Sequence, residues 1–326
     1  MRFALMIEAQ QGLSYGDQLA VAIRAEANGF ETLFRSDHYA SFPGPTGQPT
    51  TDAWAVLAGL ARETQRIGLG VLVSPVTFRH PGSFAKVVTT VDEMSGGRVE
   101  VGVGAGWNEL EHRQLGLNFP PIRERADLLE DTLAILHGLW AEPDGWSYRG
   151  HQVSVADADF KPKPVDVPGR PRTAIGGARP RILVGGEGSP RSCRLAARYA
   201  DEFNLSSSDP EKAREVFAAL DTACLAIDRD PATLTRSAMI GVLVGRDDTE
   251  MDERIAAMIL ALGPDADGLA WLAERKTRWI SGTPDEAREA VRRYEAAGVE
   301  RIMLQDFLPW DLDMIDLMGE ALVRPG

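Results

Sequence analysis

The chain has 326 residues, of which 44% are hydrophobic and 25% charged, as in soluble globular proteins. Its net charge of −13 argues against nucleic acid as a partner, and no apolar run is long enough to cross a bilayer. The two cysteines, Cys193 and Cys224, lack metal-like spacing, so we expect buried side chains and a reducing, cytoplasmic compartment.

Strand and helix patterns alternate along almost the whole chain. The first segment, residues 2–7, is a short apolar run that predicts a strand and not a secretion signal. Further strands are predicted at 32–35, 67–72, 98–103, 182–184, 202–205, 238–244 and 301–304. Helices are predicted at 15–28, 52–63, 82–94, 123–140, 190–199, 210–228, 249–262, 284–297 and 311–322.

This alternation implies parallel strands joined by crossover helices. Eight strands is the number of a TIM (β/α)8 barrel, so we predict one α/β domain over residues 1–326. Loop insertions are expected at 39–50, 141–180 and 263–281, and the middle one is compatible with a small hairpin over the barrel mouth. A doubly wound sheet is the alternative, but no boundary divides the chain in two.

The second predicted strand is followed by Asp37 and His38. Catalytic residues of a TIM barrel lie at the carboxyl ends of its strands, and histidine exchanges protons near neutral pH. We therefore predict His38 as a catalytic residue. The alternative is that Asp37 only caps the loop and that His38 lies in solvent.

The next two predicted strands end in unusual backbone. Pro75 cannot donate a ladder hydrogen bond, so its strand either stops there or bulges toward the barrel axis. The following strand ends in Gly104-Ala105-Gly106, which leaves almost no side-chain bulk. A flat ring could lie against this bare backbone. The alternative is a turn that needs glycines for its geometry.

The fifth predicted strand leads into a glycine-rich turn before a helix. Gly185, Gly186 and Gly188 expose backbone N–H groups, and Ser189 suits the helix N-cap. Such a helix N-terminus can bind phosphate. Glu187 would repel an anion, so a phosphate site requires its carboxylate to point away.

A basic segment, residues 149–181, precedes this turn. It contains seven Lys or Arg and three Asp, so it carries +4 while the rest of the chain carries −17. One interpretation is that its cations form part of the anion site. The other is that these long side chains solvate a proline-rich loop.

Other motifs argue against metal, dinucleotide and hydrolase chemistry. Trp107 occupies the last glycine position of a GxGxxG-like run, and no GxSxG motif occurs. Glu109, Glu111 and His112 lie together at a helix start but without HExxH spacing. We predict no metal site.

Four segments of the chain resemble the bacterial-luciferase-like superfamily of flavin- or deazaflavin-dependent oxidoreductases, most closely the branch that uses coenzyme F420. They are SDH at 36–38, VSPVTFRHP at 73–81, GGRVEVGVGAGWNELEHRQLG at 96–116 and ILVGGEGSPRSCRLAARYADEFN at 182–204. The resemblance implies a barrel that binds a flavin-type ring at its carboxyl-terminal mouth, and a homodimer.

By this resemblance, Asp37 would contact the deazaflavin ring and His38 would manage the proton beside the hydride-transfer centre. A non-prolyl cis peptide is implied in a bulge between Val71 and Ser74. The other implied cofactor-binding residues are those lining the ring, Ser74, Ala105 and Gly106, and those holding its phosphate, Gly185, Gly186, Gly188 and Ser189. The basic segment would suit a cofactor with a phosphate and a glutamyl tail.

We therefore expect an F420-dependent oxidoreductase that acts on a small organic substrate. The alternatives are an FMN-dependent luciferase-like monooxygenase and a flavin- or deazaflavin-binding protein without turnover. Sugar-phosphate dehydrogenases of this branch have an acidic glutamate where this chain has Trp107, with Glu109 two residues later. This departure suggests a bulkier or more apolar substrate.

Overall fold

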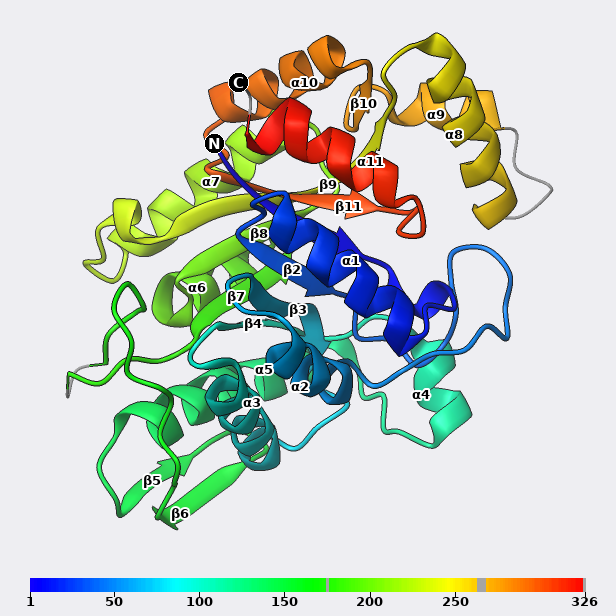
Figure 1. Cartoon of the computed structure of the whole chain (residues 1–326). Helices are drawn as coiled ribbons and strands as arrows, with labels where there is room; N and C mark the ends of the chain where they lie inside the picture. The colour runs from blue at the N-terminus through cyan, green and yellow to red at the C-terminus, as the bar shows by residue number, and fades with distance from the viewer. Residues whose placement is uncertain (174–175, 263–267, 325–326) are drawn as a thin grey trace.

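Eight parallel strands close into a barrel in the computed structural model, which describes residues 1–173, 176–262 and 268–324 (Figure 1). They are β1 (Arg2–Ile7), β2 (Thr32–Arg35), β3 (Gly68–Pro75), β4 (Val99–Gly104), β7 (Arg181–Gly186), β8 (Glu202–Ser206), β9 (Thr235–Val244) and β11 (Arg301–Asp306). β11 pairs with β1 and β8 pairs with β9, so the sheet closes on itself. The predicted TIM barrel is confirmed, and the doubly wound alternative is wrong.

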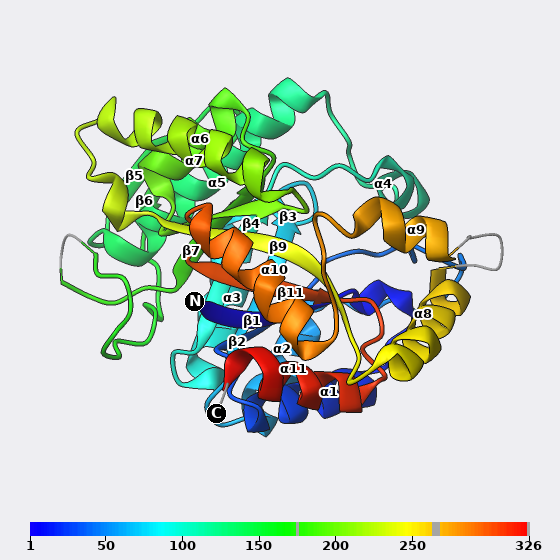
Figure 2. The ribbon, with the colours of Figure 1, turned by 90° about the horizontal axis from the view of Figure 1, so that it is seen from above.

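Helices surround the strands (Figure 2). They are α1 (Tyr15–Ala27), α2 (Ala53–Glu63), α3 (Pro81–Ser95), α4 (Glu109–Leu115), α5 (Ile122–Ala141), α6 (Pro190–Tyr199), α7 (Pro210–Leu225), α8 (Asp248–Leu262), α9 (Gly268–Arg275), α10 (Pro284–Ala296) and α11 (Leu312–Met318). Local sequence fixes several ends: Glu286 accepts the N–H of Thr283 in a capping box at 2.9 Å, and Gly29 follows α1 with φ 80°.

The barrel strands are apolar on both faces because helices cover one face and side chains fill the interior. In β1, Phe3, Leu5 and Ile7 belong to the core between sheet and helices. Ala4 and Met6 belong to a second cluster inside the barrel, with Phe34, Leu72, Leu183 and Met303. The cysteines Cys193 and Cys224 are buried, as expected.

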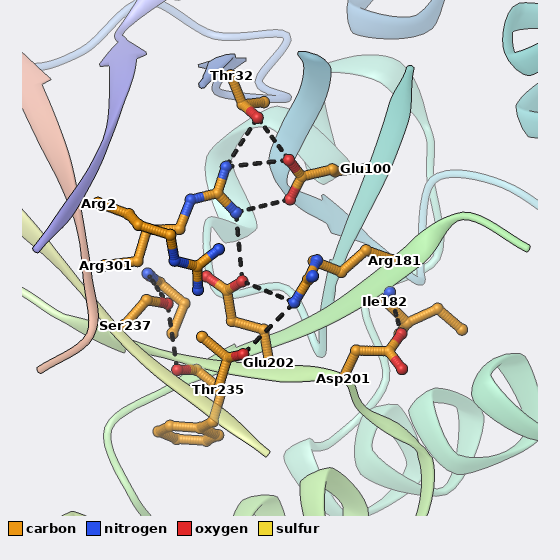
Figure 3. A network of polar contacts seen from close by, with 12 residues as sticks. Arg2, Thr32, Glu100, Arg181, Ile182, Asp201, Glu202, Thr235, Ser237 and Arg301 are labelled. Atoms are coloured by element: carbon orange, nitrogen blue, oxygen red, sulfur yellow. Dashed lines mark hydrogen bonds and ion pairs between the residues drawn. The ribbon is translucent and has the colours of Figure 1, made fainter. Parts of the chain in front are cut away.

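An ionic network closes the amino-terminal end of the barrel (Figure 3). Arg301, which is 1% exposed, contacts Glu100 at 2.7 Å, Glu202 at 3.2 Å and the Thr32 hydroxyl at 2.7 Å. Burial raises the pKa of Glu202, whereas Arg301 overcomes the effect of burial on Glu100 and lowers its pKa to about 2. With this end filled by charged side chains, a ligand can enter the barrel only from the carboxyl ends of the strands.

The middle insertion forms a hairpin of β5 (Trp146–Arg149) and β6 (Ser154–Ala158). Its turn is bound to α5, because Asp131 accepts the N–H groups of His151, Gln152 and Val153 at 2.7 to 3.0 Å. Both views place the hairpin on the side of the molecule away from α8 and α9, and none of its residues borders the cavity at the carboxyl ends of the strands (Figures 1 and 2). The expected position over the barrel mouth is therefore wrong.

The other two insertions, residues 39–50 and 263–281, lie after β2 and before α10. Part of the last one, residues 263–267, lies outside the described residues, and the remainder contributes α9 and the short strand β10 (Ile280–Gly282), which pairs with β9. The loop at 39–50 includes Phe42 and Pro43, which border the central cavity. No helix in the described part of the chain is both long and apolar enough to span a membrane.

Candidate active site

A cavity of about 1010 Å³ lies at the carboxyl ends of the barrel strands. Six of the residues predicted to form the site border it: His38, Ala105, Gly106, Gly185, Gly186 and Ser189. They come from the ends of β2, β4 and β7 and the segments that follow, which the closed barrel brings to one place. Pockets for small ligands typically have volumes of about 300–1,000 Å³, so this cavity has space for a cofactor and a substrate.

The wall of the cavity between β3 and β7 is built from glycines around one valine. The pairing of β3 with β4 shifts between Val71 and Ser74, and the Leu72–Val73 peptide is cis, which confirms the implied bulge. A Cβ on Gly104 would lie 2.7 Å from a Val73 methyl carbon, and one on Gly185 would lie 2.8 Å from the other. A larger residue does not fit at these two positions, because Val73 occupies the space where its Cβ would lie.

His38 is held by a carboxylate that the sequence interpretation did not assign to the site. The Nδ1 of His38 lies 2.9 Å from Oε1 of Glu111 in α4, and the Glu111 side chain is 1% exposed. Its other oxygen accepts the backbone N–H groups of Tyr39 at 2.8 Å and Ala40 at 3.3 Å. Because a carboxylate only accepts, Nδ1 carries the proton and Nε2 is left for a ligand.

Two aromatic rings flank His38 at the cavity mouth. The Phe42 ring lies 4.5 Å from the His38 ring and the Trp107 ring 5.6 Å from it, both edge-on. Trp107 is 66% exposed although it borders the cavity. An apolar ligand at the mouth would cover this exposed indole.

Asp37 does not border the cavity, so the cavity lining does not support its implied contact with a cofactor ring. Its buried carboxylate binds Arg79 at 2.5 and 3.2 Å, and Arg79 also pairs with Asp52, the N-cap of α2. Burial would raise the pKa of Asp52, but hydrogen bonds from Tyr39 and Arg79 outweigh it and lower that pKa. Asp37 therefore anchors the loop that carries His38.

Ser74 and Gly188 are also absent from the cavity lining. The Ser74 side chain is buried on the outer side of the strand, where its hydroxyl accepts the indole N–H of Trp54 at 2.9 Å. Gly188 serves the turn itself, since its φ is +85° and a Cβ there would lie 2.4 Å from Val216. Neither the implied contact of Ser74 with the ring nor that of the Gly188 backbone with the phosphate is supported by the cavity lining.

The glycine-rich turn after β7 leads into α6, with Ser189 as N-cap, as predicted. Two cations border the cavity here: Arg191, which pairs with Asp127 at 2.5 Å, and Arg123, which forms no ion pair within the described residues. Glu187 is exposed but still borders the cavity, so its charge remains close enough to weaken the binding of an anion.

The basic segment contributes nothing to the cavity, so its assignment to the anion site is wrong. None of its described residues borders the cavity. Five of its seven cations are instead paired with acidic side chains: Lys161 with Asp144, Arg170 with Asp92, Arg172 with Asp166, Arg179 with Asp201 and Arg181 with Glu202. Within the residues that the structure places, no group of three or more His, Cys, Asp or Glu is arranged to bind a metal.

Comparison with known proteins extends these observations. The family model described as luciferase-like monooxygenase matches residues 1–301. The F420-dependent glucose-6-phosphate dehydrogenase of Nakamurella multipartita is 30% identical over 334 positions, covering 93% of this chain and 90% of that protein. The enzyme of the same name from Microbacterium testaceum is 34% identical over 226 residues, which cover 68% of this chain but 62% of that protein.

A solved structure shows the same fold. It is an F420-dependent secondary alcohol dehydrogenase in complex with an F420–acetone adduct, and it superposes with a TM-score of 0.81. The superposition covers 99% of this chain and 98% of that chain at 20% sequence identity. At this identity the likeness establishes the shared barrel and nothing finer.

Proposed function

The chain belongs to the luciferase-like monooxygenase family, and from this premise we propose that it is an F420-dependent oxidoreductase acting on an organic substrate. The observation on which the proposal mainly rests is the His38–Glu111 pair at the mouth of a cavity with a glycine wall. Relatives that are at least 30% identical and named as F420-dependent enzymes favour the deazaflavin over FMN.

The residues present fit such a cofactor. Gly104 and Gly185 make room for the Val73 side chain, and the three residues together border the cavity as an apolar wall against which a flat ring can lie. We assign Ala105 and Gly106 to the ring, and Gly186 and Ser189 to its phosphate, with Arg123 and Arg191 nearby as cations. When bound, the deazaflavin would supply the hydride chemistry.

The chain itself supplies orientation and proton transfer. Glu111 keeps the proton of His38 on Nδ1, so Nε2 faces substrate as an acceptor, or as a donor once protonated. In alcohol oxidation, Nε2 would take the hydroxyl proton while the hydride leaves carbon. In carbonyl reduction, it would return that proton.

We infer a substrate bulkier or more apolar than a sugar phosphate. Glu109, the nearest acid in sequence to the Trp107 position, is exposed and does not border the cavity, so it does not replace the glutamate of the sugar-phosphate enzymes. Phe42 and Trp107 instead present aromatic surface beside His38. Rapid turnover of glucose 6-phosphate with F420 would contradict this inference.

The test is a titration of the protein with F420 and with FMN, followed by turnover of a panel of secondary alcohols and ketones. We expect binding of F420, and turnover that falls by about 10²–10⁴-fold in His38→Asn with cofactor affinity retained. His151→Asn, at an exposed histidine in the hairpin turn, is the matched control. Full activity in His38→Asn would contradict the catalytic role of His38.

An FMN-dependent monooxygenase is the second candidate, favoured by the description of the family model. Preferential FMN binding with substrate-dependent O₂ consumption would establish it instead. Binding of a cofactor without any turnover would favour a binding protein. We also propose that the protein is a cytoplasmic homodimer. Light scattering on the purified protein measures its mass and so tests the dimer.

A further inference from the structure

A second polar group borders the cavity, on the wall made by β1 and β11. Met6 of β1 lies opposite Gln305 of β11, and both side chains border the cavity. Glu8, two positions beyond Met6, borders it too and is 6% exposed. Glu8 directly follows the last residue of β1, so the end of this strand brings a nearly buried carboxylate to the cavity wall.

Among the residues that the structure describes, two neutral amides bind this carboxylate. Oε1 of Glu8 accepts a hydrogen bond from Nε2 of Gln305, and Oε2 accepts one from Nε2 of Gln10 at 2.7 Å. The Gln10 amide cannot turn away, because it also donates to the carbonyl of Phe42 at 2.9 Å and accepts from the hydroxyl of Ser36. The Gln10 donor is thus fixed in place.

Glu8 retains unused capacity to accept hydrogen bonds. A carboxylate offers about four lone-pair sites, and the amides use two. Among the described residues, none forms an ion pair with Glu8, although buried carboxylates are normally paired with cations. A ligand that donates a hydrogen bond from inside the cavity would supply the missing partner.

The rest of this wall sets the character of such a ligand. Met6, Met239 and Phe307 also border the cavity and contribute apolar side chains to it. The cations that border the cavity, Arg123 and Arg191, belong to the side formed by α5 and α6. An anionic group would thus be attracted to that side and repelled by Glu8.

We propose that Glu8 recognises the substrate by accepting a hydrogen bond from a hydroxyl or protonated amine on an otherwise apolar molecule. The inference rests on the proposed function only in taking this cavity as the place of reaction. Glu8 is a binding residue here, and His38 keeps the proton-transfer role.

The experiment compares three small probes of similar shape on the full chain without cofactor, by ligand-detected NMR and calorimetry. Cyclohexanol and protonated cyclohexylamine donate hydrogen bonds, whereas cyclohexanone only accepts them. We expect at least one donor to bind about tenfold more tightly than cyclohexanone, as a hydrogen bond to a charged group allows. The tighter of the two donors identifies the hydroxyl or the ammonium as the preferred group.

The variants then assign the preference to Glu8. In Glu8→Gln, the affinities for the donor and for cyclohexanone should differ by no more than about twofold. Gln305→Leu, which keeps the carboxylate and removes one amide donor, should retain it. Glu187→Gln is the matched control, since it removes the other carboxylate bordering the cavity and should also leave the preference unchanged.

Two results would overturn the proposal: donors that bind no better than cyclohexanone to the wild-type protein, or a preference that survives in folded Glu8→Gln. The wild-type comparison comes first, so it remains decisive even if that variant does not fold. F420 binding is titrated separately. Donor preference without F420 binding would refute only the proposed function, and F420 binding without donor preference would refute only the role of Glu8.

Discussion

At the scale of single residues, Glu111 determines how His38 can act. It binds Nδ1 of His38 and two backbone N–H groups of the following loop, so one buried carboxylate fixes both the ring and its support. It does not border the cavity, which makes it a positioning residue and not a catalytic one.

We predict that Glu111→Gln lowers kcat by about 10²-fold with little change in KM, because the amide no longer fixes the tautomer of His38. Steady-state kinetics with F420 and the substrate found in the panel provide the measurement. Glu109→Gln, at an exposed acid two residues earlier on α4, should behave as the wild type. Equal losses in both variants would show that Glu111 has no special role.

Asp306, at the end of β11, should make the stability of the protein depend on pH. Its carboxyl is fully buried; Oδ1 accepts the N–H of Leu308 at 2.7 Å, and Oδ2 has no hydrogen-bond partner in the described residues. Burial raises its pKa from 3.8 to about 7. Between these values the folded state binds more protons than the unfolded state, so this group contributes less stability as pH rises.

We therefore expect the free energy of unfolding of the wild type, relative to Asp306→Asn, to fall between pH 4 and pH 8. Urea denaturation at several pH values measures it. Asp285→Asn, at an exposed acid in the first turn of α10, is the control and should show no such trend. A constant difference between wild type and Asp306→Asn would mean that Asp306 does not titrate in this window.

At the scale of elements, the ends of β3, β4 and β7 form one wall because Val73 lies between two glycines. The sequence indicated glycines at the strand ends, but their common neighbour emerges only when the strands are paired. The turn after β7 reaches the same cavity, so the proposed ring and phosphate sites are continuous.

We predict that Gly185→Ala destabilises the protein by about 1–3 kcal/mol, as overpacking does, and weakens cofactor binding by displacing Val73. Thermal unfolding and a cofactor titration measure the two effects. Gly16→Ala in α1 is the control, since its Cβ would lie 3.7 Å from the nearest atom, Ser14 Oγ. Unchanged stability and affinity in Gly185→Ala would show that the wall adapts freely.

At the scale of the whole molecule, the barrel has one closed and one open end. The closed end is filled around Arg301 of β11 by the carboxylates of Glu100 in β4 and Glu202 in β8 and by the hydroxyl of Thr32 in β2 (Figure 3). Removing Arg301 would take from Glu100 and Glu202 their nearest positive charge, although Arg181 remains 3.7 Å from Glu202. Losing such a buried partner is more costly than losing an exposed ion pair.

We expect Arg301→Met to lower the free energy of unfolding by about 3–5 kcal/mol in chemical denaturation. Arg292→Gln, which breaks an ion pair whose two side chains are each 63% exposed, should cost at most about 1 kcal/mol. Similar effects of the two variants would argue that the network contributes no more than a surface pair. If Arg301→Met does not fold while Arg292→Gln does, the result agrees with the prediction.

The sequence by itself determined the barrel and the positions of His38 and the glycine-rich turns. Strand alternation, caps such as Thr283 with Glu286, and glycines at strand ends are local signals, because their physical causes lie within a few residues of one another. The resemblance to a known superfamily added the bulge at Val73, which the structure contains.

Only the tertiary structure decided which side chains meet. Glu111 lies 73 residues from His38, and Arg79 binds the carboxylate of Asp37. Five cations of the basic segment are paired with acids away from the cavity. No spacing in the sequence encodes these contacts, because they depend on closing the barrel and on which charges each buried group then finds within hydrogen-bonding distance.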